Sequence, residues 1–114
     1  MPHLDLNNPD FQQMLFALEK VERHAVMNTL GRLLPMTWAE VHAHSGLNWE
    51  QIHSLSGPSG QTLYSLRANQ KIRLVGWREG NVLRLLSIHP DHDSAYLYFG
   101  DIQGPLNKAV QARH

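Results

Sequence analysis

Basic side chains recur along short apolar runs in the third quarter of the chain. Arg67 ends a run that starts at Thr62, and Lys71 and Arg73 open the next run. Side chains alternate across a strand, so Lys71 and Arg73 would share a face with Val75 if this run is a strand. Cations gathered on one face suit the oxygens of a phosphate. The register across the intervening turn is open, so the sequence alone does not say whether Arg67 joins them.

Two histidines and a tyrosine follow the third apolar run, at His89, His92 and Tyr96, with Asp91 and Asp93 between them. An imidazole has an ordinary pKa of roughly 6.5 and exchanges a proton near neutrality, and a neighbouring carboxylate can orient it. A phenol can donate a hydrogen bond or stack on a base. RNA cleavage without a metal needs a base, cations for the phosphate and an acid for the leaving oxygen. These residue types could supply all three.

Each of these residues also has an ordinary structural explanation. Strand arginines can solvate a sheet face, and we expect Arg84 to lie on the opposite face from the others and to be structural. A histidine at a strand end can be a surface or capping residue, and a tyrosine can be plain core. The three tryptophans are expected to be packing residues (Trp38, Trp49 and Trp77).

A metal site is an alternative use of the same histidines. His89 and His92 with the nearby aspartates offer nitrogen and oxygen ligands, and His42 and His44 form a second pair. Neither spacing matches a specific zinc signature. We therefore expect no metal and no cofactor.

Bulk composition indicates one folded domain over residues 1–114. The chain has 42% hydrophobic and 18% charged residues, which is typical of a globular protein. It has no cysteine, which excludes disulfides and thiolate chemistry. It shows neither a secretory leader pattern nor an apolar stretch of membrane-spanning length, so we expect a cytoplasmic protein without membrane association.

The charges are unevenly distributed along a chain whose formal net charge is zero. Residues 1–60 carry six acidic and three basic side chains, whereas residues 61–88 carry five basic side chains and only Glu79 as an acid. A local cationic patch can therefore exist on a neutral molecule, and a phosphate responds to the local potential.

The first half of the chain is typical of helices. Asn8 and Pro9 form a helix-start signal, and apolar residues then recur at three- and four-residue spacing up to Leu33. This pattern predicts one long helix or two that break near Gly31. Thr37 and Glu40 have capping-box spacing and predict another helix through about residue 44. A short helical or irregular segment is expected around residues 47–52.

The second half is typical of an antiparallel meander. Short β-type runs at 62–67, 71–77 and 82–88 are separated by turns too short for parallel neighbours, and 95–99 could add an edge strand. These patterns predict an α+β domain with N-terminal helices packed on a twisted antiparallel sheet of three to four strands. The helical part spans about 9–55, the sheet about 61–99 and a C-terminal tail 100–114.

At these residues the chain resembles the RelE/ParE superfamily of bacterial toxins, the effector halves of type II toxin–antitoxin pairs. The matching features are the order of elements, the Leu63–Arg67 run, the Lys71–Val75 run and the His92-x-x-x-Tyr96 spacing. The resemblance implies helices on a twisted antiparallel sheet. In the RelE-like branch it implies a metal-independent endoribonuclease that often acts on mRNA in the ribosomal A site.

The resemblance also implies roles for particular residues. Arg73 matches a strand arginine that stabilises the phosphate. His92 and Tyr96 match residues that take part in acid/base catalysis or stack on a base. Arg67 and Lys71 would add phosphate contacts. His89 has no secure counterpart and is taken as a further substrate contact. The expected partners are a cognate antitoxin and mRNA, with ribosome dependence left open.

Two features depart from the pattern of the superfamily. Ribosome-dependent members are usually clearly basic, whereas this chain is neutral, and its segment from Pro35 to Gly60 is longer than the usual connection between helix and sheet. The ParE-like branch keeps the fold and inhibits DNA gyrase without cleaving RNA. A non-catalytic gyrase inhibitor is therefore the alternative function.

Overall fold

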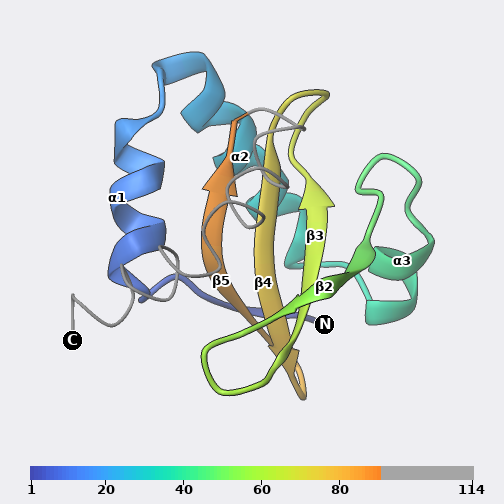
Figure 1. The fold of residues 1–114 in the computed structure, drawn as a ribbon. Coiled ribbons are helices and arrows are strands. Elements are labelled where there is room, and N and C mark those ends of the chain that lie inside the picture. The colour runs from blue at the N-terminus through green and yellow to red at the C-terminus, as the bar shows by residue number, and fades with distance from the viewer. Residues whose placement is uncertain (91–114) are drawn as a thin grey trace.

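The computed structural model describes residues 1–90 of the chain. Its elements follow the order β1 (His3–Asp5), α1 (Pro9–Ala17), α2 (Lys20–Leu33), α3 (Trp38–Ala43), β2 (Glu50–Ser56), β3 (Thr62–Arg67), β4 (Arg73–Glu79) and β5 (Val82–His89). The strands form one sheet in the order β1-β5-β4-β3-β2, with α2 behind it (Figure 1). The α+β class predicted from the sequence is confirmed, and the described part of the sheet has five strands. The expected edge strand at 95–99 and the tail at 100–114 lie outside the described residues.

The predicted long helix is two helices, but the break lies at Leu18 and Glu19 rather than near Gly31. Both residues have extended backbone, with ψ of 150° and 157°. The guanidinium of Arg23 donates a hydrogen bond of 2.8 Å to the carbonyl oxygen of Leu18, which satisfies an acceptor at the end of α1. Gly31 lies inside α2. A side chain from the second helix therefore stabilises the break.

Both predicted helix starts are present. The Asn8 side chain accepts hydrogen bonds from the backbone N–H groups of Asp10 and Phe11, as an N-cap does. At α3 the Thr37 hydroxyl accepts from the Glu40 N–H at 3.1 Å, and the Glu40 carboxylate accepts from the Thr37 N–H at 2.9 Å. The hydrogen bond from the Thr37 backbone is the main reason that the pKa of Glu40 is lowered.

The antiparallel meander β3-β4-β5 is present as predicted, but β4 starts two residues later than expected. The side-chain oxygen of Asn69 accepts hydrogen bonds of 2.8 Å from the backbone N–H groups of both Lys71 and Ile72. This Asx-type arrangement keeps Lys71 in the turn before the strand. Lys71 is therefore exposed on a turn and does not alternate with Arg73 along β4, contrary to the expectation.

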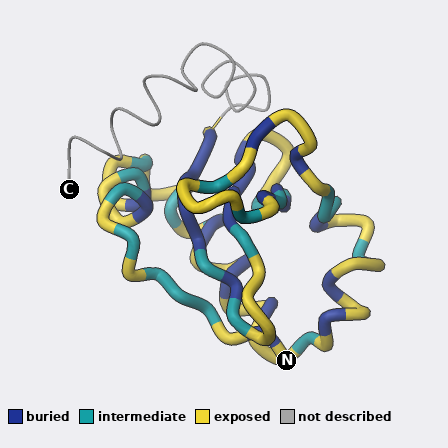
Figure 2. Tube along the Cα trace, turned by 60° about the horizontal axis from the view of Figure 1, so that its bottom comes forward, coloured by how far each residue is buried: buried dark blue, intermediate teal, exposed yellow. Residues whose placement is uncertain are grey.

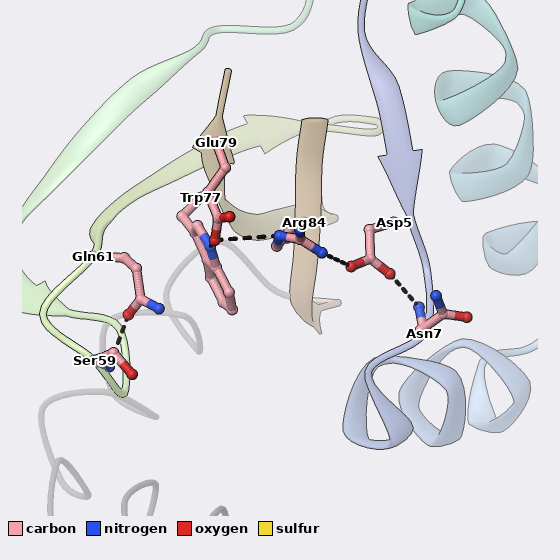
Figure 3. A network of polar contacts seen from close by, with 7 residues as sticks. All are labelled: Asp5, Asn7, Ser59, Gln61, Trp77, Glu79 and Arg84. Atoms are coloured by element: carbon pink, nitrogen blue, oxygen red, sulfur yellow. Dashed lines mark hydrogen bonds and ion pairs between the residues drawn. The ribbon is translucent and has the colours of Figure 1, made fainter. Parts of the chain in front are cut away.

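Two strands were not expected. β2 begins within the segment 47–52 that was expected to be helical or irregular and runs on to Ser56, so the helical part ends before residue 55. β1 pairs with β5 in parallel at the opposite edge. The Asp5 carboxylate at the end of β1 pairs with Arg84 of β5 and also accepts a hydrogen bond from the Asn7 N–H (Figure 3). That backbone hydrogen bond is the main cause of the lowered pKa of Asp5, with Arg84 adding to it.

A β-bulge changes the phase of β5. Val75 pairs with Ser87 and Gly76 pairs with Leu85, so Leu86 is the extra residue. Trp77 then lies opposite Arg84, which places Arg84 on the same face as Trp77 rather than on the opposite face that the sequence favoured. Arg84 is structural as expected, because it also pairs with Glu79 at 3.2 Å.

Each face of the sheet carries its own apolar cluster. The larger cluster joins the helices to the sheet residues Leu66, Leu74, Leu83, Leu85 and Ile88. The smaller cluster lies on the other face, around Leu63, Val75 and Leu86, with Ile52, Leu55 and Trp77. Both faces of β4 and β5 are therefore buried over most of their length (Figure 2). Among the described residues, no helix is long and apolar enough to cross a membrane.

Candidate functional site

The strand register brings Arg67, Arg73 and His89 into one row across three adjacent strands. Arg67 of β3 is paired with Arg73 of β4, which is paired with His89 of β5. Their chain neighbours form the adjacent row in the core beneath the helices (Leu66, Leu74 and Ile88). Side chains alternate across a strand, so the three basic residues face away from the helices. We call Arg67, Arg73 and His89 the basic row.

Arg73 is the buried centre of the basic row, with 3% of its surface exposed. Its Nη2 lies 3.2 Å from the Glu50 carboxylate, and its Nη1 donates a hydrogen bond of 3.3 Å to the Ser65 hydroxyl. A buried cation needs such partners, because the loss of hydration is otherwise too costly. The Glu50 side chain is 43% exposed, so one side of this ion pair faces solvent.

Arg67 lies beside Arg73, but among the described residues its guanidinium lacks an ion pair like that of Arg73 with Glu50. Its backbone N–H donates to the carbonyl oxygen of Leu47 at 2.7 Å, which holds this end of β3 in place. Within residues 1–90 no ion pair involves the Arg67 guanidinium. Like charges directly opposite one another in a sheet are destabilising. Among residues 1–90, the two guanidinium groups and the Glu50 carboxylate together carry a net charge of +1 at this end of the sheet.

His89 supplies a neutral imidazole at the end of the basic row. It is 3% exposed, and this burial lowers its pKa to about 4. Its Nε2 lies 2.9 Å from the Ser87 hydroxyl, two residues earlier on the same face. At neutral pH the ring is therefore uncharged and positioned by a hydroxyl group, and a neutral imidazole carries one acceptor nitrogen.

The structure brings together only some of the predicted site residues. Arg67, Arg73 and His89 are adjacent, whereas Lys71 lies on the exposed turn between β3 and β4. His92 and Tyr96 lie outside the described residues. Sequence reasoning missed Glu50, Ser65 and Ser87. Each of the two serines stands between large hydrophobic or aromatic neighbours in its strand, which is the one signal that could have identified them.

Residues 1–90 contain no group of three or more His, Asp or Glu side chains that could hold a metal ion. His42 and His44, considered above as a candidate pair, therefore lack a third such ligand in this range. The other pair, His89 with His92, lies only partly within the described residues.

Comparison with known proteins identifies no family for the chain. No family model matches it, and no curated protein matches it. Among solved structures, a copper-bound mutant toxin from Helicobacter pylori is similar over 82% of this chain and 98% of that chain, with 18% sequence identity and a TM-score of 0.46. This likeness is too distant to carry an argument about activity.

Proposed function

We propose that the chain is the toxin of a type II toxin–antitoxin system, a cytoplasmic endoribonuclease that cleaves mRNA without a metal ion. The observation that carries the proposal is the basic row. Two guanidinium groups and an imidazole lie in register on three hydrogen-bonded strands, and guanidinium groups suit the oxygens of a phosphate. Like charges in register would be stabilised by a bound anion.

In this proposal the phosphate displaces Glu50 from Arg73. Glu50 lies on the edge strand β2 and is the more exposed partner of its ion pair, so it can turn towards solvent. Arg67 and Arg73 then hold the non-bridging oxygens and stabilise the charge that develops on them. Lys71, on the adjacent turn, would contact a flanking phosphate.

The chemistry is attack by the RNA on itself. The 2′-hydroxyl loses its proton to a base, its oxygen bonds to phosphorus, and the 5′-oxygen leaves after accepting a proton, so a cyclic phosphate and a free hydroxyl result. The resemblance assigns His92 to the acid/base work and Tyr96 to proton donation or base stacking. His89, with an uncharged ring beside Ser87, would accept a hydrogen bond from the substrate.

One observation favours the alternative, a non-catalytic inhibitor of DNA gyrase. Arg73 is almost fully buried and already bonded to Glu50 and Ser65, as a structural arginine would be. In that case the basic row stabilises the sheet, and another surface contacts the partner.

A cleavage assay separates the two functions. The purified protein is incubated with RNA in EDTA, with and without ribosomes, and a parallel sample is added to a gyrase supercoiling assay. The nuclease predicts cleavage that persists in EDTA and is lost in folded Arg73→Ala and His92→Ala variants. Intact RNA together with arrested gyrase would favour the inhibitor, and cleavage abolished by EDTA would contradict the metal-independent mechanism.

A cognate antitoxin is part of the same proposal. An acidic or helical segment of that protein would cover the cationic face and compete with RNA for it. Co-expression with the product of an adjacent small reading frame should neutralise the toxicity, and purified antitoxin should protect RNA from cleavage.

A further inference from the structure

A stack of aromatic rings lies where α3 meets the edge of the sheet. The His42 ring stacks on Trp49 with centroids 5.3 Å apart and planes 28° apart, and Trp49 stacks on Tyr64 at 4.8 Å and 22°. We call these three residues the aromatic ladder. Trp38 meets its middle ring edge-on, at 5.7 Å and 72°.

The exposure of the side chains increases along this group from the core to the surface. Trp38 is 9% exposed and belongs to the core, as expected for a packing tryptophan. Trp49 and Tyr64 are half-buried, and His42 at the end of the ladder is exposed on α3. The stack therefore runs from the sheet out to the surface, where the end ring can receive a further planar group.

A cation accompanies the ladder. The Arg78 guanidinium lies 4.0 Å from the ring centroid of Trp38, and Arg78 is itself exposed. The Nε1–H of Trp38 is buried and has no acceptor within residues 1–90. Aromatic faces beside a cation are a combination that binds single-stranded nucleic acid, because every base has a π-face and every phosphodiester carries a negative charge.

The ladder and the basic row lie on opposite faces of the sheet, and Trp49 and Glu50 at the start of the edge strand β2 contact one each. Trp49 and Glu50 are consecutive, yet the Trp49 ring stacks on the helix side of the sheet while the Glu50 carboxylate contacts Arg73 on the other side. A single strand of RNA that rounds the β2 edge would thus pass from one to the other.

We infer that the aromatic ladder, with Arg78, stacks a base of the same single-stranded RNA whose phosphate the basic row holds on the other face of the sheet. This inference rests on the proposed function, to which it adds a binding subsite. It assigns His42 as the outermost base contact and Trp49 as the ring that supports it.

The test measures binding separately from cleavage. A fluorescent 2′-O-methyl oligoribonucleotide, which lacks the attacking hydroxyl, is titrated with the full chain and followed by anisotropy. His42→Ala should weaken binding about 5- to 10-fold, the loss of roughly 1 kcal/mol of stacking. His24→Ala is the matched control, because His24 is an exposed histidine on α2, and it should bind as the parent chain does.

An abasic oligomer of the same length identifies the source of the effect. It should bind the parent chain and His42→Ala equally, because it has no base to stack. Equal affinities of His42→Ala and His24→Ala for the base-containing oligomer would overturn the inference, as would a His42 effect that persists with the abasic one or an absence of any RNA binding. Tight binding without cleavage of ordinary RNA would instead contradict only the nuclease.

Discussion

The ion pair between Arg73 and Glu50 joins a buried cation to a carboxylate that is partly in water. Such a pair has two opposite consequences. It stabilises the fold, because the guanidinium would otherwise be buried with less compensation. In the proposed function it also inhibits, because the carboxylate occupies the position that a phosphate needs.

Glu50→Gln separates these consequences. We expect the free energy of unfolding to fall by about 1–2 kcal/mol, less than for a fully buried pair because Glu50 is partly exposed. RNA cleavage per folded molecule should rise, because an uncharged amide competes more weakly for Arg73 than a carboxylate does. Urea denaturation and an RNA cleavage assay measure the two effects, with the exposed Glu19→Gln as the control. Loss of cleavage in folded Glu50→Gln would show that the carboxylate takes part in the chemistry.

His89 makes the stability of the fold depend on pH. Burial lowers its pKa from 6.5 to about 4, so the unfolded chain binds a proton in this window that the folded chain does not. The contribution of the buried, neutral His89 ring to the free energy of unfolding is complete above pH 6.5 and is lost as the pH falls towards 4. Between about pH 7 and pH 4.5 this single group should cost about 2–3 kcal/mol.

The measurement is the unfolding free energy at several pH values for the parent chain and His89→Gln. On acidification the free energy of unfolding of His89→Gln should fall by about 2–3 kcal/mol less than that of the parent chain. The exposed control His24→Gln should keep the parent's pH dependence. An NMR titration of the His89 ring that gave a pKa above about 6, near the ordinary value, would contradict the burial argument.

At the level of elements, the bulge between β4 and β5 depends on Gly76. A Cβ at this position would lie 2.3 Å from the carbonyl oxygen of Arg84, a backbone atom that cannot turn away. Gly76→Ala should therefore lower the unfolding free energy by about 2 kcal/mol or more. Gly31→Ala is the matched control, because the residue is helical and a Cβ there would have nothing within 4 Å. That substitution should stabilise by about 0.5–1 kcal/mol. Equal effects in thermal denaturation would contradict the close approach.

The elements that the sequence predicted are those with local signals. The caps at Asn8 and Thr37 and the run 62–67 of β3 are where the pattern placed them. The strand β1 has three residues and exists only because β5, almost eighty residues away, offers an edge to pair with. The late start of β4 follows from a side-chain hydrogen bond of Asn69 rather than from hydrophobic alternation.

The candidate site, like the fold, could be predicted from the sequence only where the signal is local. The sequence identified Arg67, Arg73 and His89 as candidates from residue type, but their alignment depends on strand register, which no local pattern specifies. Glu50 belongs to a strand that was not expected, so its ion pair with Arg73 could not be predicted. The roles of His92 and Tyr96 remain predictions.

For the whole molecule, a formal net charge of zero and a local positive row are compatible. The acidic residues are concentrated in residues 1–60, while the row lies on strands from the basic segment 61–88 and on His89. A chain arranged in this way would bind phosphate locally without the long-range attraction of a strongly basic protein. This supports an account in which specific contacts, rather than overall charge, hold the RNA.

Arg67 offers the most direct test of that account, because it is the member of the basic row with no ion pair within residues 1–90. The measurement is the rate of RNA cleavage in EDTA by Arg67→Gln and by Arg32→Gln, which removes an exposed arginine at the end of α2. A phosphate contact by Arg67 predicts a loss of about 100-fold for Arg67→Gln, the usual effect of removing one group that stabilises a developing charge, and an unchanged rate for Arg32→Gln. Equal rates for the two folded variants would contradict it.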